Sequence, residues 1–290
     1  MGQIIACANQ KGGVGKTTTV VNLATYLGRL GKRVLVVDLD PQGNATSGFG
    51  VDRASLTATL FDVVLGDATL ESVVVDTVAE NCWLAPASVS LAGAEVDLAT
   101  MDRRERRLSV VLGEARGRYD YILLDCPPSL GLLTVNALTA SDSVLIPTQC
   151  EYYALEGLSQ LIATLNLVRD NLNPGLAIKG VVLTMYDART NLSADVAAEV
   201  RKHLGDAVFD TVIPRSIRLS EAPSFGLPVA LYRGDSRGAV AYSELAAELL
   251  GRDNRVVGEV PVPLQPSTAT IEPRAVDSGA RTPIAIGGPS

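Results

Sequence analysis

The chain has 290 residues, of which 47% are hydrophobic and 20% are charged. This amount of apolar side chain can fill a core, so intrinsic disorder of the whole chain is excluded, and the length predicts one large domain with an appendage. The formal net charge is −7. Such a charge excludes a surface that is basic throughout, although it leaves room for a local basic patch.

The four cysteines, Cys7, Cys82, Cys126 and Cys150, form no C-x-x-C pair. Neither a zinc site nor a thioredoxin-type motif therefore has the ligand spacing that it needs. No apolar run approaches the roughly 18 residues that span a bilayer, and the first residues lack the pattern of a signal peptide. We therefore expect a cytoplasmic protein without a membrane partner.

Short apolar runs alternate with longer amphipathic stretches along the chain. An apolar run at 4–8 is followed by a helical period at 17–30 and a second apolar run at 33–40. The further strands that we expect are 82–87, 119–128, 142–148, 179–187 and 208–213. The further helices that we expect are 88–116, 131–140, 151–171, 191–204 and 239–250. Near-continuous Val, Ile and Leu runs are typical of strands buried on both faces, so the pattern predicts an α/β fold with a doubly wound, mostly parallel sheet flanked by helices.

The composition changes near the C-terminus. Residues 258–290 contain six prolines, and no hydrophobic periodicity runs through them. This composition is typical of a disordered tail. We therefore predict a folded domain over residues 1–251 and a Pro-rich, disordered tail over residues 252–290.

The strongest motif lies between the first expected strand and the first expected helix. Its residues are Lys11, Gly12, Gly13, Val14, Gly15, Lys16, Thr17 and Thr18. Glycines let backbone N–H groups converge on a phosphate, and the N-terminus of the next helix favours its negative charge. Lys16 is expected to contact the β- and γ-phosphates, Thr17 to ligate Mg²⁺, and Thr18 to contact the α-phosphate. The spacing departs from G-x-x-x-x-G-K-[ST], because position 10 is Gln.

Three aspartates end expected strands beside this loop. Asp38 and Asp40 follow the second strand, and Asp125 ends the strand at 119–128. In a parallel sheet such ends line the ligand crevice, and carboxylates suit Mg²⁺. One such aspartate could equally form a turn or cap a helix. Three of them beside a phosphate loop favour a metal site.

The segments ANQKGGVGKTT, VVDLDPQGNAT and ILLDCPPS together resemble the ParA/Soj group of the deviant Walker A ATPases, whose relatives include MinD and the nitrogenase iron protein. The resemblance continues in order through TMYDART and IPRSIRLSEAPSFG, and it covers roughly residues 2–250. It implies that the folded domain is a P-loop ATPase, which hydrolyses ATP to ADP and phosphate with Mg²⁺.

The resemblance also implies roles for single residues. Lys11 is the signature lysine, which in the family reaches the phosphates of a partner subunit, so ATP would favour a sandwich homodimer. Asp40 would position or activate the attacking water, while Asp38 and Asp125 would hold the metal mostly through its waters. The implied catalytic residues are Lys11, Lys16 and Asp40, and the implied metal ligands are Thr17, Asp38 and Asp125.

Two further sites follow from the resemblance. Pro214, Arg215 and Ser216 correspond to the loop that packs on adenine, although Ser216 stands where the family often has Asn. Arg189 and Arg218 match positions that contact DNA without sequence preference, which they would do by neutralising phosphates.

The function that this resemblance implies is DNA segregation, of a chromosome or of a plasmid. An ATP-bound dimer would bind double-stranded DNA of the nucleoid, and a ParB/Spo0J-like partner would stimulate hydrolysis and release it. The alternative is a MinD-like ATPase that positions cell division at the membrane. That function needs a basic amphipathic helix at the C-terminus, which a Pro-rich tail with balanced charges does not favour.

Two other functions are less favoured. An iron–sulfur protein like the nitrogenase iron protein would need cysteines that meet at a dimer axis, whereas Cys7 and Cys126 lie on expected strands. A P-loop kinase or ligase that acts on a metabolite would need an acceptor site, and the sequence has no further group of residues that suggests one.

Overall fold

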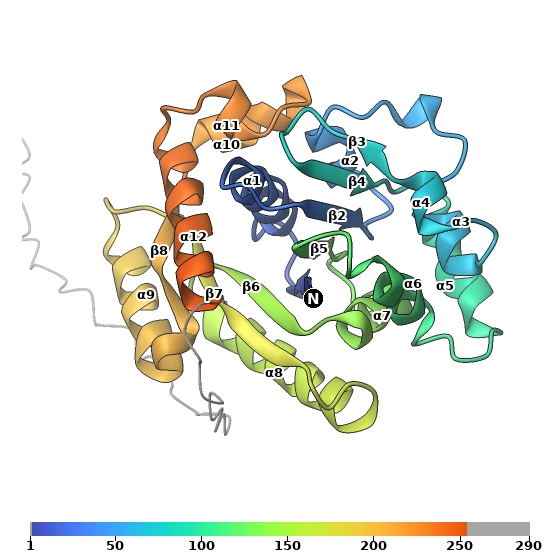
Figure 1. Ribbon diagram of the computed structural model, residues 1–290. Helices are drawn as coiled ribbons and strands as arrows, with labels where there is room; N and C mark the ends of the chain where they lie inside the picture. Colours follow the sequence, from blue (N-terminus) through green and yellow to red (C-terminus); the bar gives the residue numbers. More distant parts are fainter. Residues whose placement is uncertain (1, 254–290) are drawn as a thin grey trace, which may run out of the picture.

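The computed structural model describes residues 2–253. Within them, eight strands form one sheet in the order β3-β4-β2-β5-β1-β6-β7-β8 (Figure 1). The strands are β1 (Gln3–Cys7), β2 (Val34–Asp38), β3 (Val75–Asp76), β4 (Cys82–Ala85), β5 (Tyr121–Asp125), β6 (Ser143–Gln149), β7 (Ala177–Tyr186) and β8 (Val208–Pro214). All neighbouring strands are parallel except β3, which pairs antiparallel with β4. The prediction of a mostly parallel sheet is confirmed.

Helices cover both faces of this sheet (Figure 1). One face carries α1 (Lys16–Arg29), α2 (Asn44–Gly48), α10 (Ile217–Glu221), α11 (Val229–Tyr232) and α12 (Arg237–Asp253). The other face carries α3 (Leu60–Leu65), α4 (Leu70–Val73), α5 (Leu91–Ala99), α6 (Arg107–Ala115), α7 (Leu132–Ala140), α8 (Ala154–Asn171) and α9 (Asn191–Leu204). Short 3-10 turns are η1 (Arg53–Ser55), η2 (Gly205–Ala207) and η3 (Ala222–Phe225). None of the helices within residues 2–253 combines the length and apolar character that crossing a bilayer requires.

Strand β1 shows why the sequence folds into three layers. Ile4 and Ala6 point into the core under the second group of helices, whereas Ile5 and Cys7 point into the core under α1 and α12. All four side chains are at most 2% exposed. A strand that is apolar on both faces must be covered on both, so the run at 4–8 lies in the middle of the sheet.

The predicted single helix at 88–116 is wrong. The chain forms α5 and α6 instead, and between them Arg103 adopts a positive φ of 54°. Asn136 of α7 stabilises the break, because its amide donates to the carbonyl of Arg104 (2.7 Å) and accepts from the N–H of Leu108 (3.2 Å). These partners are distant in sequence, so the local hydrophobic period does not reveal them.

The carboxyl ends of the central strands bring the predicted site together. β1 lies between β5 and β6, and β5 also pairs with β2. In this register Asp125 is the direct partner of Cys7 on one side and of Asp38 on the other. The loop that follows β1 therefore begins beside Asp125, with Asp38 one strand further away.

The last described helix is anchored at the opposite, amino-terminal edge of the sheet. The hydroxyl of Tyr121, at the start of β5, donates to the carboxylate of Asp253 (2.5 Å). The ammonium of Lys179 forms an ion pair with the same carboxylate and donates to Gln3 Oε1 (2.9 Å). The predicted boundary after residue 251 thus falls inside α12, and the tail predicted beyond it lies, from residue 254 on, outside the described residues.

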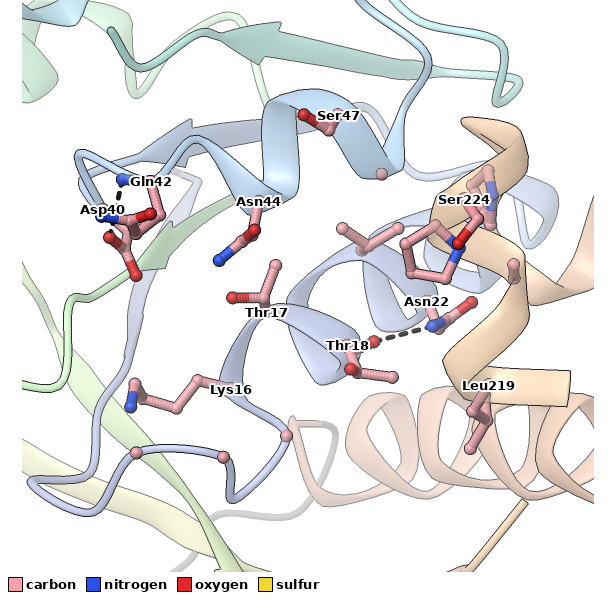
Figure 2. A pocket seen from close by; sticks show the side chains of 18 of the residues that line it. Lys16, Thr17, Thr18, Asn22, Asp40, Gln42, Asn44, Ser47, Leu219 and Ser224 are labelled. Atoms are coloured by element: carbon pink, nitrogen blue, oxygen red, sulfur yellow. Dashed lines mark hydrogen bonds between the residues drawn. The ribbon is translucent and has the colours of Figure 1, made fainter. Parts of the chain in front are cut away.

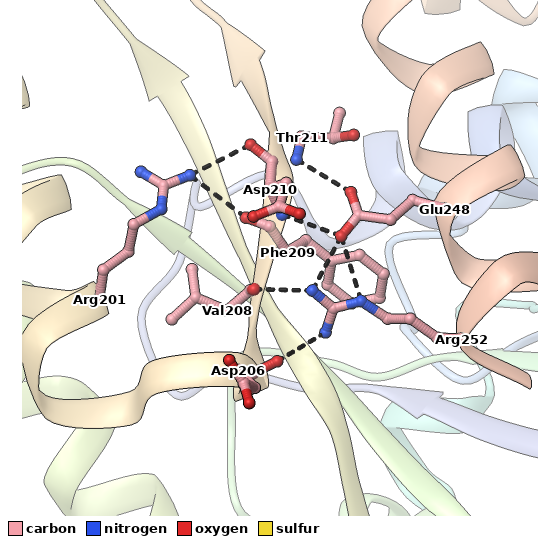
Figure 3. A network of polar contacts seen from close by, with 8 residues as sticks. All are labelled: Arg201, Asp206, Val208, Phe209, Asp210, Thr211, Glu248 and Arg252. Carbon is pink, nitrogen blue, oxygen red and sulfur yellow. Dashed lines mark hydrogen bonds and ion pairs between the residues drawn. The ribbon is translucent and has the colours of Figure 1, made fainter. Parts of the chain in front are cut away.

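Side chains, rather than a further strand, pair with backbone groups of the edge strand β8 (Figure 3). Glu248 of α12 accepts from the N–H groups of Asp210 and Thr211, both at 2.9 Å. Arg252 donates to the carbonyl of Val208 (2.7 Å), and its guanidinium lies 4.0 Å over the ring of Phe209. These contacts attach α12 to the sheet and leave less of the edge free to pair with another chain.

Arg201 of α9 adds to this network from the other side of the sheet. Its guanidinium donates to the carbonyls of Phe209 (3.3 Å) and Asp210 (3.1 Å). Arg252 also donates to the carbonyl of Asp206 (3.0 Å) and to the carboxylate of Glu248 (2.8 Å). Helices from both layers therefore converge on β8.

Replacing Glu248 with Ala should destabilise the protein. The change leaves two backbone N–H groups without their acceptor and Arg252 without its carboxylate, so we expect the free energy of unfolding to fall by about 2 kcal/mol. Urea denaturation measures it. Glu244→Ala, at an exposed position of the same helix, is the control and should change it by less than about 0.5 kcal/mol. An equally small loss for both variants would contradict the stabilising role of the Glu248 contacts.

Candidate nucleotide site

The glycine-rich loop has a conformation that only glycines adopt easily. Gly13 has a φ of 74° and Gly15 a φ of 90°, both in the left-handed region. Gly15 is the N-cap of α1, and no side chain caps this helix. Val14 is buried, and its carbonyl accepts from the hydroxyl of Thr184 (2.8 Å), which fixes the loop to β7. The first N–H groups of α1 therefore remain available to an anion.

A cavity of about 630 Å³ opens beside this loop (Figure 2). Its size is that of a site for a small molecule. The predicted residues that line it are Gly12, Gly13, Gly15, Lys16, Thr17, Thr18 and Asp40. Figure 2 shows Lys16 and Thr17 extending toward the end of the cavity that Asp40 and Gln42 line. The loop thus contributes both a cation and a hydroxyl to one region.

Asp38 does not line the cavity and is fully buried. Its carboxylate accepts from the hydroxyl of Thr46 (2.7 Å), from the N–H of Thr46 (2.8 Å) and from the N–H of Asp40 (3.2 Å). Burial raises the pKa of Asp38, although the bonds from Thr46 oppose this rise. Asp38 is therefore fixed in place and holds the start of α2.

Asp125 differs from Asp38 because no described residue forms a hydrogen bond with either oxygen of its carboxylate. It is fully buried, and burial followed by the charge of Asp38 raises its pKa well above the ordinary value, although the nearby hydroxyl of Thr17 and the charge of Lys16 oppose this rise. A buried anion without a partner is costly, and a cation would relieve that cost. The site thus fits a divalent cation.

The donors at this site are oxygen atoms, which Mg²⁺ prefers. Within residues 2–253 no group of three His, Cys, Asp or Glu side chains is arranged to enclose a metal ion. Mg²⁺ usually keeps several of its waters and takes few protein ligands. The predicted set of Thr17, Asp38 and Asp125 is compatible with that kind of binding.

Lys11 lies outside the cavity lining. Its ammonium is 2.8 Å from the carboxylate of Glu151, in the loop after β6, and the two side chains are 44% and 46% exposed. An exposed ion pair contributes only about 0–1 kcal/mol. Lys11 can therefore exchange Glu151 for a stronger anion.

Pro214, Arg215 and Ser216 do not line the cavity either. Its far wall consists instead of a segment that the sequence analysis did not single out as a site. The residues of this wall, which we call the 219–228 wall, are Leu219, Ala222, Pro223, Ser224, Leu227 and Pro228. The sequence did contain one signal for this wall, the concentration of proline and apolar residues just after the predicted adenine loop.

The two arginines predicted to contact DNA lie away from the cavity, and each contacts a carboxylate. Arg189, 86% exposed, donates to both oxygens of Asp187 at 2.9 and 2.7 Å. Arg218, about half exposed, lies 2.6 Å from the carboxylate of Glu221. Both guanidinium groups reach the surface, but each already forms an ion pair with a carboxylate of the same chain.

Comparisons with known proteins agree on one family. A family model described as an AAA domain matches residues 2–178. The sporulation initiation inhibitor protein Soj of Bacillus subtilis is 57% identical over 249 residues, which are 86% of this chain and 98% of that protein. The chromosome partitioning protein ParA of Caulobacter vibrioides is 52% identical over 253 residues, 87% of this chain and 95% of that protein.

A solved structure has the same fold. Cobyrinic acid a,c-diamide synthase from Mycobacterium smegmatis, with a bound ATP analogue and magnesium, matches with a TM-score of 0.77 at 39% identity. The match covers 90% of this chain and 99% of that one.

The Asp125→Asn variant tests the metal site. Removing a buried charge that has no partner should raise the free energy of unfolding of the metal-free protein at pH 8 by about 1–3 kcal/mol. The same variant should lose the rise in Tm that Mg²⁺ and ATP produce together. Urea denaturation and thermal unfolding measure the two effects. Asp235→Asn, at an exposed carboxylate, is the control, and a metal-free Asp125→Asn protein less stable than the parent would argue against the site.

Proposed function

Because this chain belongs to the Soj/ParA family of chromosome-partitioning ATPases, we propose that its ATP-bound form binds DNA and that hydrolysis of ATP releases it. The chain is an ATPase whose cofactors are ATP and Mg²⁺. One observation supports the proposal above all. At the carboxyl ends of the central strands, the N-terminus of α1, which no described side chain caps, lies near the buried carboxylate of Asp125, with which no described residue forms a hydrogen bond. Such an edge is suited to a triphosphate and its cation.

In this proposal the loop and the strand ends divide the chemistry. Lys16 neutralises charge on the phosphates, and the N–H groups of α1 orient them. Thr17 would hold the metal directly, whereas Asp38 and Asp125 would hold it through water. When bound, Mg²⁺ supplies electrostatic stabilisation of the phosphate oxygens. Asp40 lines the cavity and accepts from the N–H of Gln42 (2.9 Å), which fixes one oxygen and leaves the other to position a water.

Lys11 is proposed to complete the site of a second copy of this chain. To reach a partner's phosphates it must leave Glu151, and the exposure of that ion pair makes the exchange inexpensive. An additional cation that arrives only on dimerisation acts like an arginine finger supplied in trans. ATP would in this way favour the homodimer, and a ParB-like protein would stimulate its hydrolysis on the nucleoid.

Arg189 and Arg218 are proposed as the contacts to double-stranded DNA. Their side chains reach the surface, which phosphate neutralisation requires. Two arginines in one copy form a weak site, but a dimer doubles the number of phosphates that are neutralised. Binding should therefore depend both on ATP and on ionic strength.

DNA binding with ATP, with ADP and without nucleotide tests the proposal. We expect tight binding only with ATP and a steep loss of affinity as salt rises. Arg218→Glu should reduce this affinity at least about tenfold, because it replaces a phosphate contact by a repulsion. Arg103→Glu, the same change at an exposed turn between α5 and α6, should reduce it far less. Fluorescence anisotropy measures these affinities, and equal binding with ATP and ADP would contradict the switch.

Glu221→Gln should have the opposite effect on DNA binding. The carboxylate of Glu221 holds Arg218 at 2.6 Å and accepts from the hydroxyl of Tyr232 (3.2 Å), so it competes with a phosphate for the same guanidinium. Removing its charge should strengthen the ATP-dependent binding by about threefold. Glu244→Gln alters the net charge equally at an exposed site on α12 and is the control. No gain over that control would show that Glu221 does not compete.

A further inference from the structure

The turn that follows Asp40 contains two successive peptide groups whose N–H groups both bind this residue. The N–H of Gln42 donates to the carboxylate of Asp40 (2.9 Å), as Figure 2 shows, and the N–H of Gly43 donates to its backbone carbonyl (2.8 Å). Asp40 and Gln42 both line the cavity. The orientation of these two peptide groups therefore restrains the carboxylate of Asp40.

Arg53, the first residue of η1, holds the same two peptide groups from their other side. In a trans peptide the C=O points away from the N–H. The guanidinium of Arg53 donates to the carbonyl of Gln42 (2.7 Å), which shares a peptide group with the N–H of Gly43. It also donates, over a longer distance, to the carbonyl of Pro41 (3.4 Å), which shares a peptide group with the N–H of Gln42. Asp40 and Arg53 thus bind opposite sides of both peptide groups.

The surroundings of Arg53 favour this arrangement. Gly43 leaves room for the guanidinium, because a Cβ at this position would lie 2.8 Å from Arg53 Cζ. Asp52 caps η1, since its side chain accepts from the N–H of Ala54 (3.0 Å), and Arg53 itself is half-buried. The planar fork of an arginine is suited to binding two acceptors at once. Arg53 does not line the cavity, so it acts on a bound nucleotide through the turn that it holds.

We propose that Arg53 is a positioning residue for ATP hydrolysis. It holds the turn at 41–43 so that one carboxylate oxygen of Asp40 stays bound to the N–H of Gln42 and the other remains available to the attacking water. This inference rests on the proposed function, in which Asp40 positions that water. Because the glycine-rich loop and Lys16 bind the phosphates in that proposal, losing Arg53 should slow the chemical step and leave nucleotide affinity unchanged.

Arg53→Ala tests this role in the full-length protein. Without the guanidinium the turn is free to reorient, so the kcat for ATP hydrolysis should fall about tenfold. The KM for ATP and the Kd for ADP should stay within about twofold of the parent values. Arg53→Lys keeps one charged donor for the carbonyl of Gln42 but loses the planar fork, and its kcat should stay within about threefold of the parent. Steady-state kinetics and calorimetry measure these constants.

Arg107→Ala is the matched control. Arg107 is also half-buried, and its guanidinium also donates to two successive carbonyls, those of Val64 (3.1 Å) and Leu65 (2.7 Å). It also lies against a glycine, since a Cβ on Gly66 would be 2.7 Å from Arg107 Nη2. These contacts are at the end of α3, and none of the four residues lines the cavity. The variant should lose comparable thermal stability while its kcat stays within about twofold of the parent.

A second measurement follows the turn itself and needs no ATPase activity. In the nucleotide-free protein, Arg53→Ala should speed hydrogen exchange of the Gln42 and Gly43 amides at least about threefold, whereas Arg107→Ala should not. The inference is overturned if Arg53→Ala leaves this exchange or the kcat at the parent value, if its Kd for ADP rises as much as its kcat falls, or if Arg107→Ala lowers kcat equally. An Asp40→Ala variant that hydrolysed ATP at the parent rate would instead refute the proposed role of Asp40.

Discussion

The arrangement of the nucleotide site depends on two buried carboxyl groups, those of Asp38 and Asp125, which lie next to each other. The register of β2 with β5 makes Asp38 and Asp125 direct neighbours, and both are fully buried. Thr46 donates hydrogen bonds to Asp38, but within residues 2–253 no residue forms a hydrogen bond with Asp125. The ionised form of Asp125 is therefore costly in the protein alone, and a cation bound beside it would lower that cost and stabilise the fold.

The satisfied aspartate connects the metal region to the rest of the cavity. Thr46, which Asp38 binds, lies on α2, and the turn after α2 presses Gly50 against Gly226 of the 219–228 wall. Asn22 of α1 accepts from the N–H of Val229, the residue that follows this wall (2.8 Å). Asp38, α2, α1 and the 219–228 wall are thus linked through a chain of short contacts. A displacement of one of these parts should shift the positions of the others, because closely packed interiors transmit strain.

Local patterns in the sequence were sufficient for every strand of the sheet except β3 and for the phosphate loop. Continuous apolar runs such as 4–8 marked the buried strands. Positions 13 and 15 have a positive φ, which glycine adopts more easily than other residues. Tertiary contacts decided what was missed. The break between α5 and α6 depends on Asn136, and the short elements from α2 to β3 have too few residues to show a period. The two aspartates were predictable as neighbours, but the lack of a partner for Asp125 was not, because it depends on every residue around it.

The cavity wall illustrates a different limit. The residues from Leu219 to Pro228 come from α10, η3 and the turn before α11, and they form one surface only when these short elements fold back on α1. Resemblance to a family pointed to 214–216, which do not line this cavity, and their contact with adenine stays a prediction. Sequence motifs identify the phosphate end well because its chemistry needs fixed residue types, whereas an apolar wall can be built from many combinations.

The contacts of Asp253 fix the end of α12 against the sheet. Tyr121 and Lys179 hold this residue at the amino-terminal edge of the sheet, while the phosphate loop follows the carboxyl end of β1. Asp253 and the nucleotide cavity consequently lie at opposite ends of the strands, so a bound nucleotide and the end of α12 do not compete for space.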